Sequence, residues 1–401
     1  KKIAYNNAGT LEFLVDPNGN HYFLEMNTRI QVEHPVTEMV TGLDIVELQI
    51  QIAAGNQLSL KQKDIRISGH AIEARLYAED PGKNFMPSPG KVELYHEPVM
   101  PGLRVDSGIN GKEKLHPEYD PLISKVIFHA QSREEAIDGL NSALKTFIIH
   151  GPKNNKEFLN EILADTDFRH NRISTTYLES ATSRLNIELN RKKTEFDKVR
   201  IFSAWLAWKL FSPVNKEDNS IWTKIGFWRM DIRKSVIFEE KQFDIQVGNI
   251  KGQWISYSIN GIEHELAVKT LSGQKVIFEL DGEWSSASVS RAYSYEDIIS
   301  IDGLEFKIRP LDYLPIQPYL IDHQEIGETG TRVLKSPLFG KISKIIAEPG
   351  MKIKKGDFLY SLDAMKIENK FTSPYNGHIK EIKVKEGEQV QINQTVLVID
   401  T

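Results

Sequence analysis

The chain has 401 residues, of which 40% are apolar and 26% are charged, and its formal net charge at pH 7 is -5. This composition is typical of a folded globular protein and excludes a disordered or collagen-like chain. The mildly acidic balance argues against a nucleic-acid partner, and no run approaches the ~20 apolar residues of a membrane span. Because the sequence lacks cysteine, disulfides and thiolate chemistry are excluded, which fits a reducing compartment.

At roughly 150 residues per domain, the length predicts two to four domains. The first residue is Lys1, and the sequence enters a strand-like segment at Thr10 with almost no lead-in. No pattern typical of a signal or transit peptide precedes that segment. We therefore expect this chain to be the C-terminal part of a longer protein.

The first predicted element is a hairpin with strands over Thr10–Val15 and His21–Met26, joined at the turn signal Asn18-Gly19. A hairpin centred on this turn pairs positions whose numbers sum to 37, which places Glu12 directly opposite Glu25. Opposed carboxylates repel each other unless a cation compensates, and Mg²⁺ prefers a few carboxylates together with substrate phosphates. The hairpin therefore predicts a divalent-cation site.

The second strand is expected to continue in extended form to Glu33. Its polar side chains would then share one face, because side chains alternate along a strand; they belong to Glu25, Asn27, Arg29, Gln31 and Glu33. Alone, this alternation is typical of a solvated strand face. Together with the opposed glutamates it favours a functional face.

Helices and one strand follow in the next hundred residues. An amphipathic helix is predicted from Glu38 to Ala54, closed by Gly55. A β-rich run covers Leu122–Ala130, and a capping-box pattern at Ser132–Glu135 then begins a helix that ends near Phe147. Lys156–Ala164 is a further predicted helix.

The region 184–312 is predicted to be an antiparallel barrel around a buried helix. Phe196–Phe211 is apolar on nearly all sides, so it should be buried on nearly all sides. Turn signals at Asn260-Gly261, Asp281-Gly282 and Asp302-Gly303 lie 21 residues apart, which leaves room for two strands and an opposite turn each time. A β-sandwich with a helix on one face is the alternative.

The last 66 residues repeat with a period of 37, after a Pro- and Gly-containing linker predicted over 313–333. Ser336-Pro337 matches Ser373-Pro374, Gly340 matches Gly377, and Asp363 matches Asp400. Two such halves predict a flattened β-barrel with quasi-twofold symmetry. The halves meet at Asp363–Glu368, so Lys366 is predicted to project into solvent from a hairpin tip.

The sequence Ala-Met-Lys at Ala364–Lys366 resembles the biotin-attachment motif of biotin carboxyl carrier domains, and residues 334–401 are similar to that family throughout. Ile367 and Asp363 depart mildly from the family's usual Met and Glu. The resemblance implies covalent biotin on Lys366, attached by a biotin protein ligase. Lipoyl domains share the fold but typically lack the Met before the lysine, so lipoate is the less favoured alternative to biotin.

The string EMNTRIQVEHPVTE at 25–38 is closely similar to the signature of biotin carboxylases of the ATP-grasp superfamily. The similarity continues through Gly69–Glu73, Pro87–Gly90 and Tyr119–Lys125, so that residues 1 to about 180 resemble the C-terminal portion of that enzyme. The sequence has no glycine-rich phosphate loop. We therefore expect that this polypeptide alone does not turn over ATP.

The resemblance also implies roles for individual residues. The ligands of Mg²⁺ (or Mn²⁺) would be Glu12, Glu25 and Asn27. The bicarbonate pocket would be formed by Arg29, Gln31 and the backbone at Val32, because a fixed guanidinium fork suits an anion. Glu33 would be the general base that deprotonates bicarbonate, and Arg104 would bind biotin and stabilise its enolate. The catalytic residues are thus predicted to be Arg29, Glu33 and Arg104.

The domain order narrows the kind of carboxylase. The roughly 150 residues between the two modules are too few for a ~250-residue TIM barrel, and they resemble the subunit-interaction domain of acyl-CoA carboxylase α subunits. The implied protein is a ligase that carboxylates biotin with ATP and bicarbonate and passes the carboxyl group to an acyl-CoA on a separate carboxyltransferase β subunit. An α/β hetero-oligomer is expected, in the bacterial cytoplasm or, in a eukaryote, the mitochondrial matrix.

The tryptophan-rich segment Ile221–Arg229 favours 3-methylcrotonyl-CoA, a substrate of leucine catabolism, over propionyl-CoA, with geranyl-CoA a further possibility. A non-catalytic carrier or assembly module is the alternative from a different functional class. The predicted fold is multidomain α+β. Its parts are an ATP-grasp segment (1–65), a biotin carboxylase C-terminal domain (66–183), the β-barrel with its central helix (184–312), the linker (313–333) and a biotinyl domain (334–401).

Overall fold

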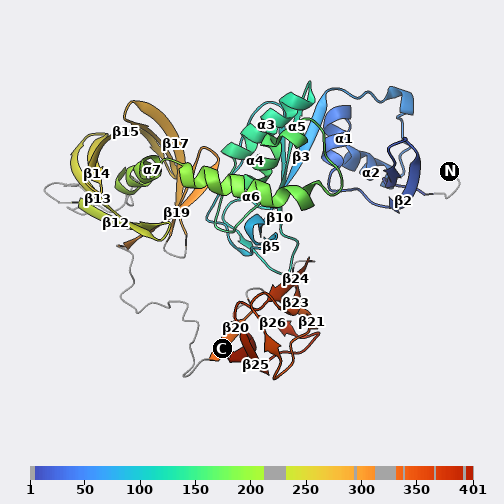
Figure 1. The fold of residues 1–401 in the computed structure, drawn as a ribbon. Helices are drawn as coiled ribbons and strands as arrows, with labels where there is room; N and C mark the ends of the chain where they lie inside the picture. The colour runs from blue at the N-terminus through green and yellow to red at the C-terminus, as the bar shows by residue number, and fades with distance from the viewer. Residues whose placement is uncertain are drawn as a thin grey trace.

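The computed structural model describes residues 5–211, 232–292, 296–311, 331–336, 339–364, 367–391 and 394–400. Most of the predicted linker, the whole tryptophan-rich segment and Lys366 lie outside these ranges. Along the described chain, a hairpin with two short helices is followed by a helix-flanked sheet, a barrel and a small β domain (Figure 1). None of the helices in these ranges is long and apolar enough to span a membrane.

The N-terminal hairpin consists of β1 (Thr10–Val15) and β2 (His21–Asn27), as predicted. The strand predicted to run on to Glu33 instead ends at Asn27, and the chain turns before α1 (His34–Thr41). That prediction was wrong because alternation of polar residues does not by itself show that a strand has a neighbour with which to pair. The polar side chains after Asn27 therefore do not share a strand face.

The helix predicted over Glu38–Ala54 is two helices, α1 and α2 (Ile45–Ala53). Gly42 ends α1 in the left-handed conformation, with φ of 70°. Asp44 then caps α2, because its side chain accepts a hydrogen bond from the backbone N–H of Glu47. A glycine stop followed by an aspartate start thus interrupts a continuous amphipathic pattern.

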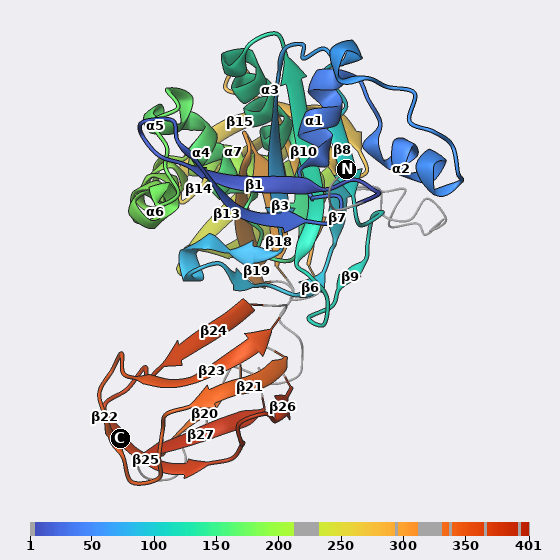
Figure 2. The ribbon, with the colours of Figure 1, turned by 90° about the vertical axis from the view of Figure 1, so that its right-hand side faces the viewer.

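The next part is a three-stranded antiparallel sheet with the order β3 (His70–Tyr77), β10 (Leu122–Ala130) and β8 (Leu103–Ser107). The predicted capping box is confirmed at the start of α3 (Arg133–Thr146). Helix α3 packs on one face of the sheet, while α1 packs against β3 and β10 (Figure 2). Smaller elements complete this part: β4 (Glu79–Asp80), β5 (Met86–Pro87), β6 (Gly90–Lys91), β7 (Leu94–His96), β9 (Lys114–Leu115), β11 (Ile148–His150), α4 (Lys156–Ala164), α5 (Thr166–Arg169) and two 3-10 turns, Gln62–Asp64 and Pro81–Lys83.

The predicted barrel is confirmed, and the sandwich alternative is wrong. Helix α7 (Lys198–Phe211) is buried on most sides, and its fully buried Trp205 donates from its indole Nε1 to Asp297 Oδ2 at 2.8 Å. An unpredicted helix, α6 (Tyr177–Glu195), precedes it and runs through position 184. The barrel closes from β12 to β19; the strands are Ile232–Phe238, Lys241–Lys251, Trp254–Ile259, Ile262–Ser272, Lys275–Leu280, Glu283–Arg291, Asp297–Ile301 and Leu304–Pro310.

The three predicted Asn-Gly and Asp-Gly turns join barrel strands with both turn residues at positive φ. At the first of them, φ is 49° for Asn260 and 86° for Gly261, and Ile259 pairs with Ile262. Positive φ at both central residues matches the right-handed twist of the flanking strands. Buried polar contacts join this barrel to the preceding part: His150 lies between the hydroxyls of Ser290 and Ser300 at 2.7 and 2.8 Å.

The C-terminal domain has two four-stranded sheets, β20-β27-β25-β22 and β24-β23-β21-β26. The 37-residue repeat maps β21 (Gly340–Ile345) onto β25 (Gly377–Ile382) and β22 (Lys352–Ile353) onto β26 (Gln389–Val390). A Cβ at Gly340 would clash with the carbonyl of Asp363, and one at Gly377 with the equivalent carbonyl of Asp400. The repeated glycines are therefore required by the same close approach of two strands. The remaining strands are β20 (Thr331–Lys335), β23 (Phe358–Ala364), β24 (Ile367–Thr372) and β27 (Thr395–Asp400).

Strand β20 begins inside the predicted linker, so the linker is shorter than predicted at its C-terminal end. Strands β23 and β24 pair as far as Ala364 and Ile367. Met365 and Lys366, which join them in sequence, lie outside the described residues. The exposure of the Lys366 side chain therefore stays a prediction.

Candidate active site

The hairpin brings two glutamates face to face. Glu12 pairs with Glu25 in the β1–β2 register, which confirms the predicted opposition. Asn27 Nδ2 donates to Glu12 Oε1 at 2.6 Å and to Glu25 Oε1 at 3.2 Å, and Gln31 Nε2 donates to Glu12 Oε1 at 2.7 Å. Side-chain amides from the end of β2 and the following loop thus stabilise the two carboxylates by donating hydrogen bonds, and the pair keeps its charge.

The loop that produces this pairing has the predicted ends, but the pairing beside it is not centred between Asn18 and Gly19. Val15 pairs with His21, so the connection is a five-residue loop, Asp16–Asn20, in which Asp16 accepts two backbone hydrogen bonds on its side chain. The register shifts between Glu12 and Phe13, where a bulge leaves one extra residue on β2. Next to the loop the paired positions therefore sum to 36 instead of the predicted 37, and the bulge restores the predicted pairing at Glu12.

The donor set around the hairpin fits a hard divalent cation. Glu12, Glu25 and the amide of Asn27 offer oxygen ligands, which Mg²⁺ prefers. Within the ranges that the structure describes, no group of three or more His, Cys, Asp or Glu residues could hold a metal. A cation here would therefore be held by the two carboxylates, by Asn27 turned so that its amide oxygen faces them, and by groups of a bound substrate.

The predicted bicarbonate residues are brought to one short loop but not to one cluster of side chains. Arg29 donates to the carbonyl of Ile30 at 3.1 Å, whereas the Gln31 side chain reaches back to Glu12. The carbonyl of Val32 accepts from Lys125 Nζ at 3.2 Å. This loop therefore connects the carboxylate pair on the hairpin with the three-stranded sheet.

The predicted base, Glu33, forms an ion pair with the sheet. Arg75 on β3 places its Nη2 2.5 Å from Glu33 Oε2, although the two residues are 42 positions apart in sequence. The Glu33 side chain is 49% exposed, so its carboxylate remains accessible to a small substrate while it is fixed in place. An exposed carboxylate with a defined orientation suits a general base.

The predicted enolate-stabilising residue, Arg104, lies on the neighbouring strand β8 between two carboxylates. Its Nη1 donates to Glu38 Oε2 at 2.6 Å, and its Nε and Nη2 donate to Asp106 at 2.8 and 3.0 Å. Burial alone would raise the pKa of Asp106, but hydrogen bonds from Arg104 and Lys125 hold that pKa below its usual range. Arg104 is thus a fixed cation with only part of its surface in solvent.

Comparisons with known proteins identify three parts of the chain. The family described as the C-terminal domain of biotin carboxylase matches residues 73–180, the ATP-binding domain of the carbamoyl-phosphate synthase L chain matches 1–61, and the family described as a biotin-requiring enzyme matches 332–399. Over 97% of this chain, the human mitochondrial propionyl-CoA carboxylase alpha chain is 33% identical. The chain therefore combines a part of the biotin carboxylase C-terminal type with a part of the biotin-requiring type.

Two further relatives carry different substrate names. The mitochondrial methylcrotonoyl-CoA carboxylase subunit alpha of Rattus norvegicus is 31% identical over 97% of this chain. This chain covers 55% of that protein's length. The 2-oxoglutarate carboxylase small subunit of Hydrogenobacter thermophilus is 47% identical over 52% of this chain and 43% of its own length. The chain spans about half the length of the curated relatives that it matches, 54% in the case of the human protein.

Several charged residues around the candidate site received no role in the sequence analysis. Glu38, Arg75, Asp106 and Lys125 each contact a predicted site residue through a hydrogen bond or ion pair. A signal for some of them was present, because Arg75 follows Glu73 and Asp106 follows Arg104 at a spacing of two, which puts each pair on one face of a strand. Sequence alone does not tell which face of each strand meets α1.

Glu73 is a second largely buried carboxylate on this face of the sheet, beside Glu38. Its side chain is 5% exposed, and neither carboxylate oxygen accepts a hydrogen bond. Burial raises its pKa, while the charges of Lys125 and Arg75 oppose that rise. Arg75 Nε lies 3.6 Å from Glu73 Oε1, so Glu73 interacts with the site through charge alone.

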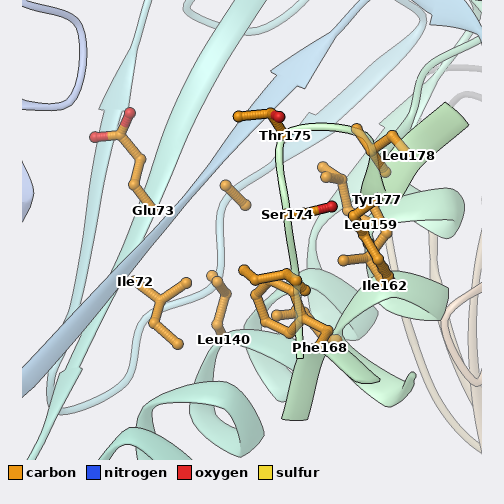
Figure 3. Close-up of a pocket in the computed structure, with 13 residues that line it drawn as sticks. Ile72, Glu73, Leu140, Leu159, Ile162, Phe168, Ser174, Thr175, Tyr177 and Leu178 are labelled. Atoms are coloured by element: carbon orange, nitrogen blue, oxygen red, sulfur yellow. The ribbon is translucent and has the colours of Figure 1, made fainter. Parts of the chain in front are cut away.

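A cavity of about 370 Å³ lies on the other side of β3, where Ile72, Leu140 and Phe168 line it. The Glu73 carboxylate points away from Leu140 and Phe168 (Figure 3). Glu73 also borders this cavity, but its carboxylate points away, and the cavity does not contain the predicted site residues.

Proposed function

We propose that this chain is part of the α subunit of an acyl-CoA carboxylase, in which biotin on Lys366 accepts a carboxyl group from bicarbonate at the expense of ATP and delivers it to an acyl-CoA. The main support is that one chain combines a charged face around Glu33 and Arg104 with a C-terminal domain of the biotin-requiring type. The ureido group of a bound biotin supplies the nitrogen that carries the carboxyl group.

In this proposal each site residue has one task. Glu33 takes the proton from the O–H of bicarbonate, which makes bicarbonate the better nucleophile. Arg29, Gln31 and the backbone of Val32 hold the anion. Arg104 supplies a fixed positive charge where an enolate would develop on the biotin ring. Mg²⁺ or Mn²⁺ would be held by Glu12, Glu25 and Asn27 against the phosphates of ATP.

The acyl-CoA would bind to a separate carboxyltransferase β subunit, in an α/β hetero-oligomer. The barrel around α7 supports this, because it is a closed unit between the candidate active site and the biotinyl domain, which suits a role in assembly. A biotin protein ligase would modify Lys366. The location would follow the host: the cytoplasm of a bacterium, or the mitochondrial matrix, as the names of the animal relatives state for those proteins.

For the acyl group, 3-methylcrotonyl-CoA remains our first proposal, with propionyl-CoA next and geranyl-CoA third. The preference depends on Ile221–Arg229, which lies outside the described residues. Relatives of the propionyl and methylcrotonyl types are similar to this chain to nearly the same degree, 33% and 31%. The acyl-CoA therefore has to be identified by assay.

The attachment of biotin is tested first. The chain is co-expressed with a biotin protein ligase, and intact mass and streptavidin binding are measured for the wild type, Lys366→Ala and Lys370→Ala. We expect biotin on the wild type and on Lys370→Ala, an exposed lysine of the same hairpin, and none on Lys366→Ala. Lipoate on Lys366, or an unmodified chain, would contradict the proposal.

The reaction is tested in the assembled carboxylase that contains this chain. Fixation of labelled bicarbonate is compared for 3-methylcrotonyl-CoA, propionyl-CoA, geranyl-CoA and 2-oxoglutarate. Arg29→Ala should abolish carboxylation of biotin, whereas Arg172→Ala, an exposed arginine that pairs with Asp167 on the surface, should not. If Arg29→Ala left biotin carboxylation intact, the chain would be a carrier or assembly module instead.

A further inference from the structure

A methionine outside the biotinyl domain packs against the core of that domain. Met86 lies on β5, in the part of the chain that the biotin carboxylase C-terminal family matches (73–180), here called the carboxylase part. It is one of the partly buried apolar residues around the buried cluster that includes Ile342, Leu362 and Ile399. The other partly buried residues around this cluster all come from the biotinyl domain and are Leu334, Ile345, Phe371 and Ile382. The contact of Met86 therefore connects two parts of the chain.

The turn before Met86 has a backbone conformation that side chains rarely adopt. Asn84 and Phe85 have φ of 53° and 56°. Asparagine tolerates this region, whereas a bulky residue such as phenylalanine enters it only at a cost. Phe85 packs edge-on against Phe158 of α4, with the ring centroids 5.4 Å apart, which fixes the strained residue. Strained backbone that its surroundings hold in place is typical of functional sites.

The same turn is fixed relative to the charged face of the sheet. Strand β4 begins two residues after β3 ends, and Met86 pairs with Asp80 on β4. Asn155 connects the two strands, because its Nδ2 donates to the carbonyl of Arg75 at 3.1 Å and to Glu79 Oε1 at 3.0 Å. Met86 is therefore held in a defined position beside the candidate active site.

The side of the biotinyl domain that faces the carboxylase part carries the strands around Lys366. Strand β23 ends at Ala364 and β24 begins at Ile367, so Lys366 lies between them in sequence. Both views place β24 on the side of the domain toward the carboxylase part, near β5 in Figure 1 and near β6 in Figure 2. A domain docked in this orientation directs its biotin-attachment end toward the carboxylase part.

The chemistry of the contact suits a domain that has to bind and then leave. A thioether side chain is flexible and polarizable, so it packs against apolar surfaces of different shapes. Transient interfaces are small, whereas a large apolar interface is typical of permanent complexes. A tethered domain does not need a high affinity, because the tether gives it a high effective concentration. A small contact around one methionine therefore orients the domain without trapping it.

We propose that the turn formed by residues 80–86 is a docking surface for the biotinyl domain of this chain, with Met86 as its apolar contact. The inference rests on the proposed function, because docking brings the biotin on Lys366 to the candidate active site. Met86 is a positioning residue, since it acts on the carrier domain and not on the reacting atoms. It should therefore matter for biotin on Lys366 and not for biotin that is free in solution.

The first test compares tethered with free biotin in the assembled carboxylase that contains this chain. Met86→Gln should lower the carboxylation of tethered biotin at least about 5-fold, because the tethered domain loses its orientation. Rates are expressed per attached biotin, which is measured by streptavidin binding. In a Lys366→Ala background, which carries no tethered biotin, the same substitution should leave the carboxylation of free biotin unchanged.

The matched control is Met351→Gln. Met351 is a 38% exposed methionine of the biotinyl domain, directly before β22, and β22 lies at the end of the domain away from the carboxylase part (Figure 2). This control should match the wild type with tethered biotin and, in the Lys366→Ala background, with free biotin.

The second test detects the contact directly. The sequence contains no cysteine, so Met86→Cys gives this chain a single thiol, to which a benzophenone maleimide is attached. On irradiation it should cross-link to peptides of the biotinyl domain, which are identified by mass spectrometry. The same reagent on Met351→Cys should not cross-link to the carboxylase part.

The outcomes separate the docking surface from the proposed function. An assembled wild type that carboxylates neither tethered nor free biotin would overturn the proposed function and the docking surface with it. An active wild type would overturn the docking surface alone if Met86→Gln kept the rate with tethered biotin or lost the rate with free biotin. If Met86→Gln does not fold, or if the enzyme does not accept free biotin, the cross-link decides: a link from position 86 to the biotinyl domain supports the docking surface, and links only within the carboxylase part overturn it.

Discussion

The hairpin and the sheet each contribute carboxylates to the candidate site, but they stabilise them differently. On the hairpin, Glu12 and Glu25 oppose each other, and the hydrogen bonds described for them come from neutral amides. At the sheet, Glu38 of the covering helix α1 is 5% exposed and is bound directly by the guanidinium of Arg104 on β8. The glutamate pair on the hairpin thus keeps a negative charge that a bound cation would balance. The carboxylates at the sheet are already balanced by neighbouring arginine and lysine side chains.

The two regions also differ in how much solvent surrounds them, since the hairpin is largely exposed and the charged face of the sheet is covered. Seven large apolar residues of the hairpin are each between 49% and 61% exposed. They are Leu11, Phe13, Leu14, Val15, Tyr22, Phe23 and Leu24. The charged face of the sheet is covered by α1 (Figure 2). A substitution on the sheet should therefore change folding and chemistry together, and a substitution on the hairpin should change mainly the response to a cation.

The largest effect is expected for Arg104→Met. Removing the guanidinium leaves the buried Glu38 carboxylate without its cation, which typically costs about 3 kcal/mol of unfolding free energy. Carboxylation of biotin should fall at least ~100-fold, because the fixed charge for the enolate is lost. Urea unfolding of this chain and the bicarbonate-fixation assay of the assembled enzyme measure the two effects. Arg172→Met, which breaks a surface ion pair, is the control and should change stability by less than about 0.5 kcal/mol.

A medium effect is expected for Glu73→Gln, and it should depend on pH. Burial raises the pKa of Glu73, although the positive charges of Lys125 and Arg75 reduce that rise. The Glu73 carboxyl therefore ionises at lower pH in the unfolded chain than in the folded chain. The wild type therefore loses stability from this group as the pH rises above 4.5, its ordinary value. Glu73→Gln, which cannot ionise, should gain on the order of 1 kcal/mol relative to the wild type between pH 5 and pH 8. Equal unfolding free energies of the two proteins at pH 8 would contradict this.

Local signals in the sequence were sufficient for the barrel and the C-terminal domain. The turn residues at Asn260-Gly261 and the 37-residue repeat act over short distances, so the strands that they predict do not depend on unknown neighbours. The capping box at Ser132 and Glu135 is another signal of this kind. These features were predictable because the physical cause and the residues that carry it are close together in the chain.

The charged face of the sheet was only partly predictable, because its contacts are distant in sequence. Arg75 reaches Glu33 across 42 positions, and Arg104 reaches Glu38 across 66. Strand alternation shows which residues share a face but not which helix covers that face. Resemblance to a family supplied Arg104 and Glu33, whereas the partners that hold them became visible only when the strands were placed side by side.

The hairpin shows how a correct pairing was predicted from an incorrect centre of the register. The sequence predicted a pairing centred between Asn18 and Gly19, but Val15 pairs with His21 across the loop that Asp16 organises. This shifts the register by one, and the bulge after Glu12 shifts it back. A one-residue slip would otherwise place the two glutamates on opposite faces. Bulges leave no clear mark in a single sequence, so this compensation was not predictable.

The smallest effect, and the one that best separates hairpin from sheet, is expected for Glu25→Gln. Without a divalent cation the substitution removes a like-charge pair, so this chain should become more stable by about 0.5 kcal/mol. Thermal unfolding is measured with and without Mg²⁺ for the wild type, Glu25→Gln and Glu263→Gln, an exposed glutamate of the barrel. Mg²⁺ should stabilise the wild type and the barrel variant, and should stabilise Glu25→Gln less, because a ligand stabilises only the state that binds it. If Glu25→Gln lowered stability without Mg²⁺, the hairpin would be neutralised like the sheet, and the contrast between the two regions would be wrong.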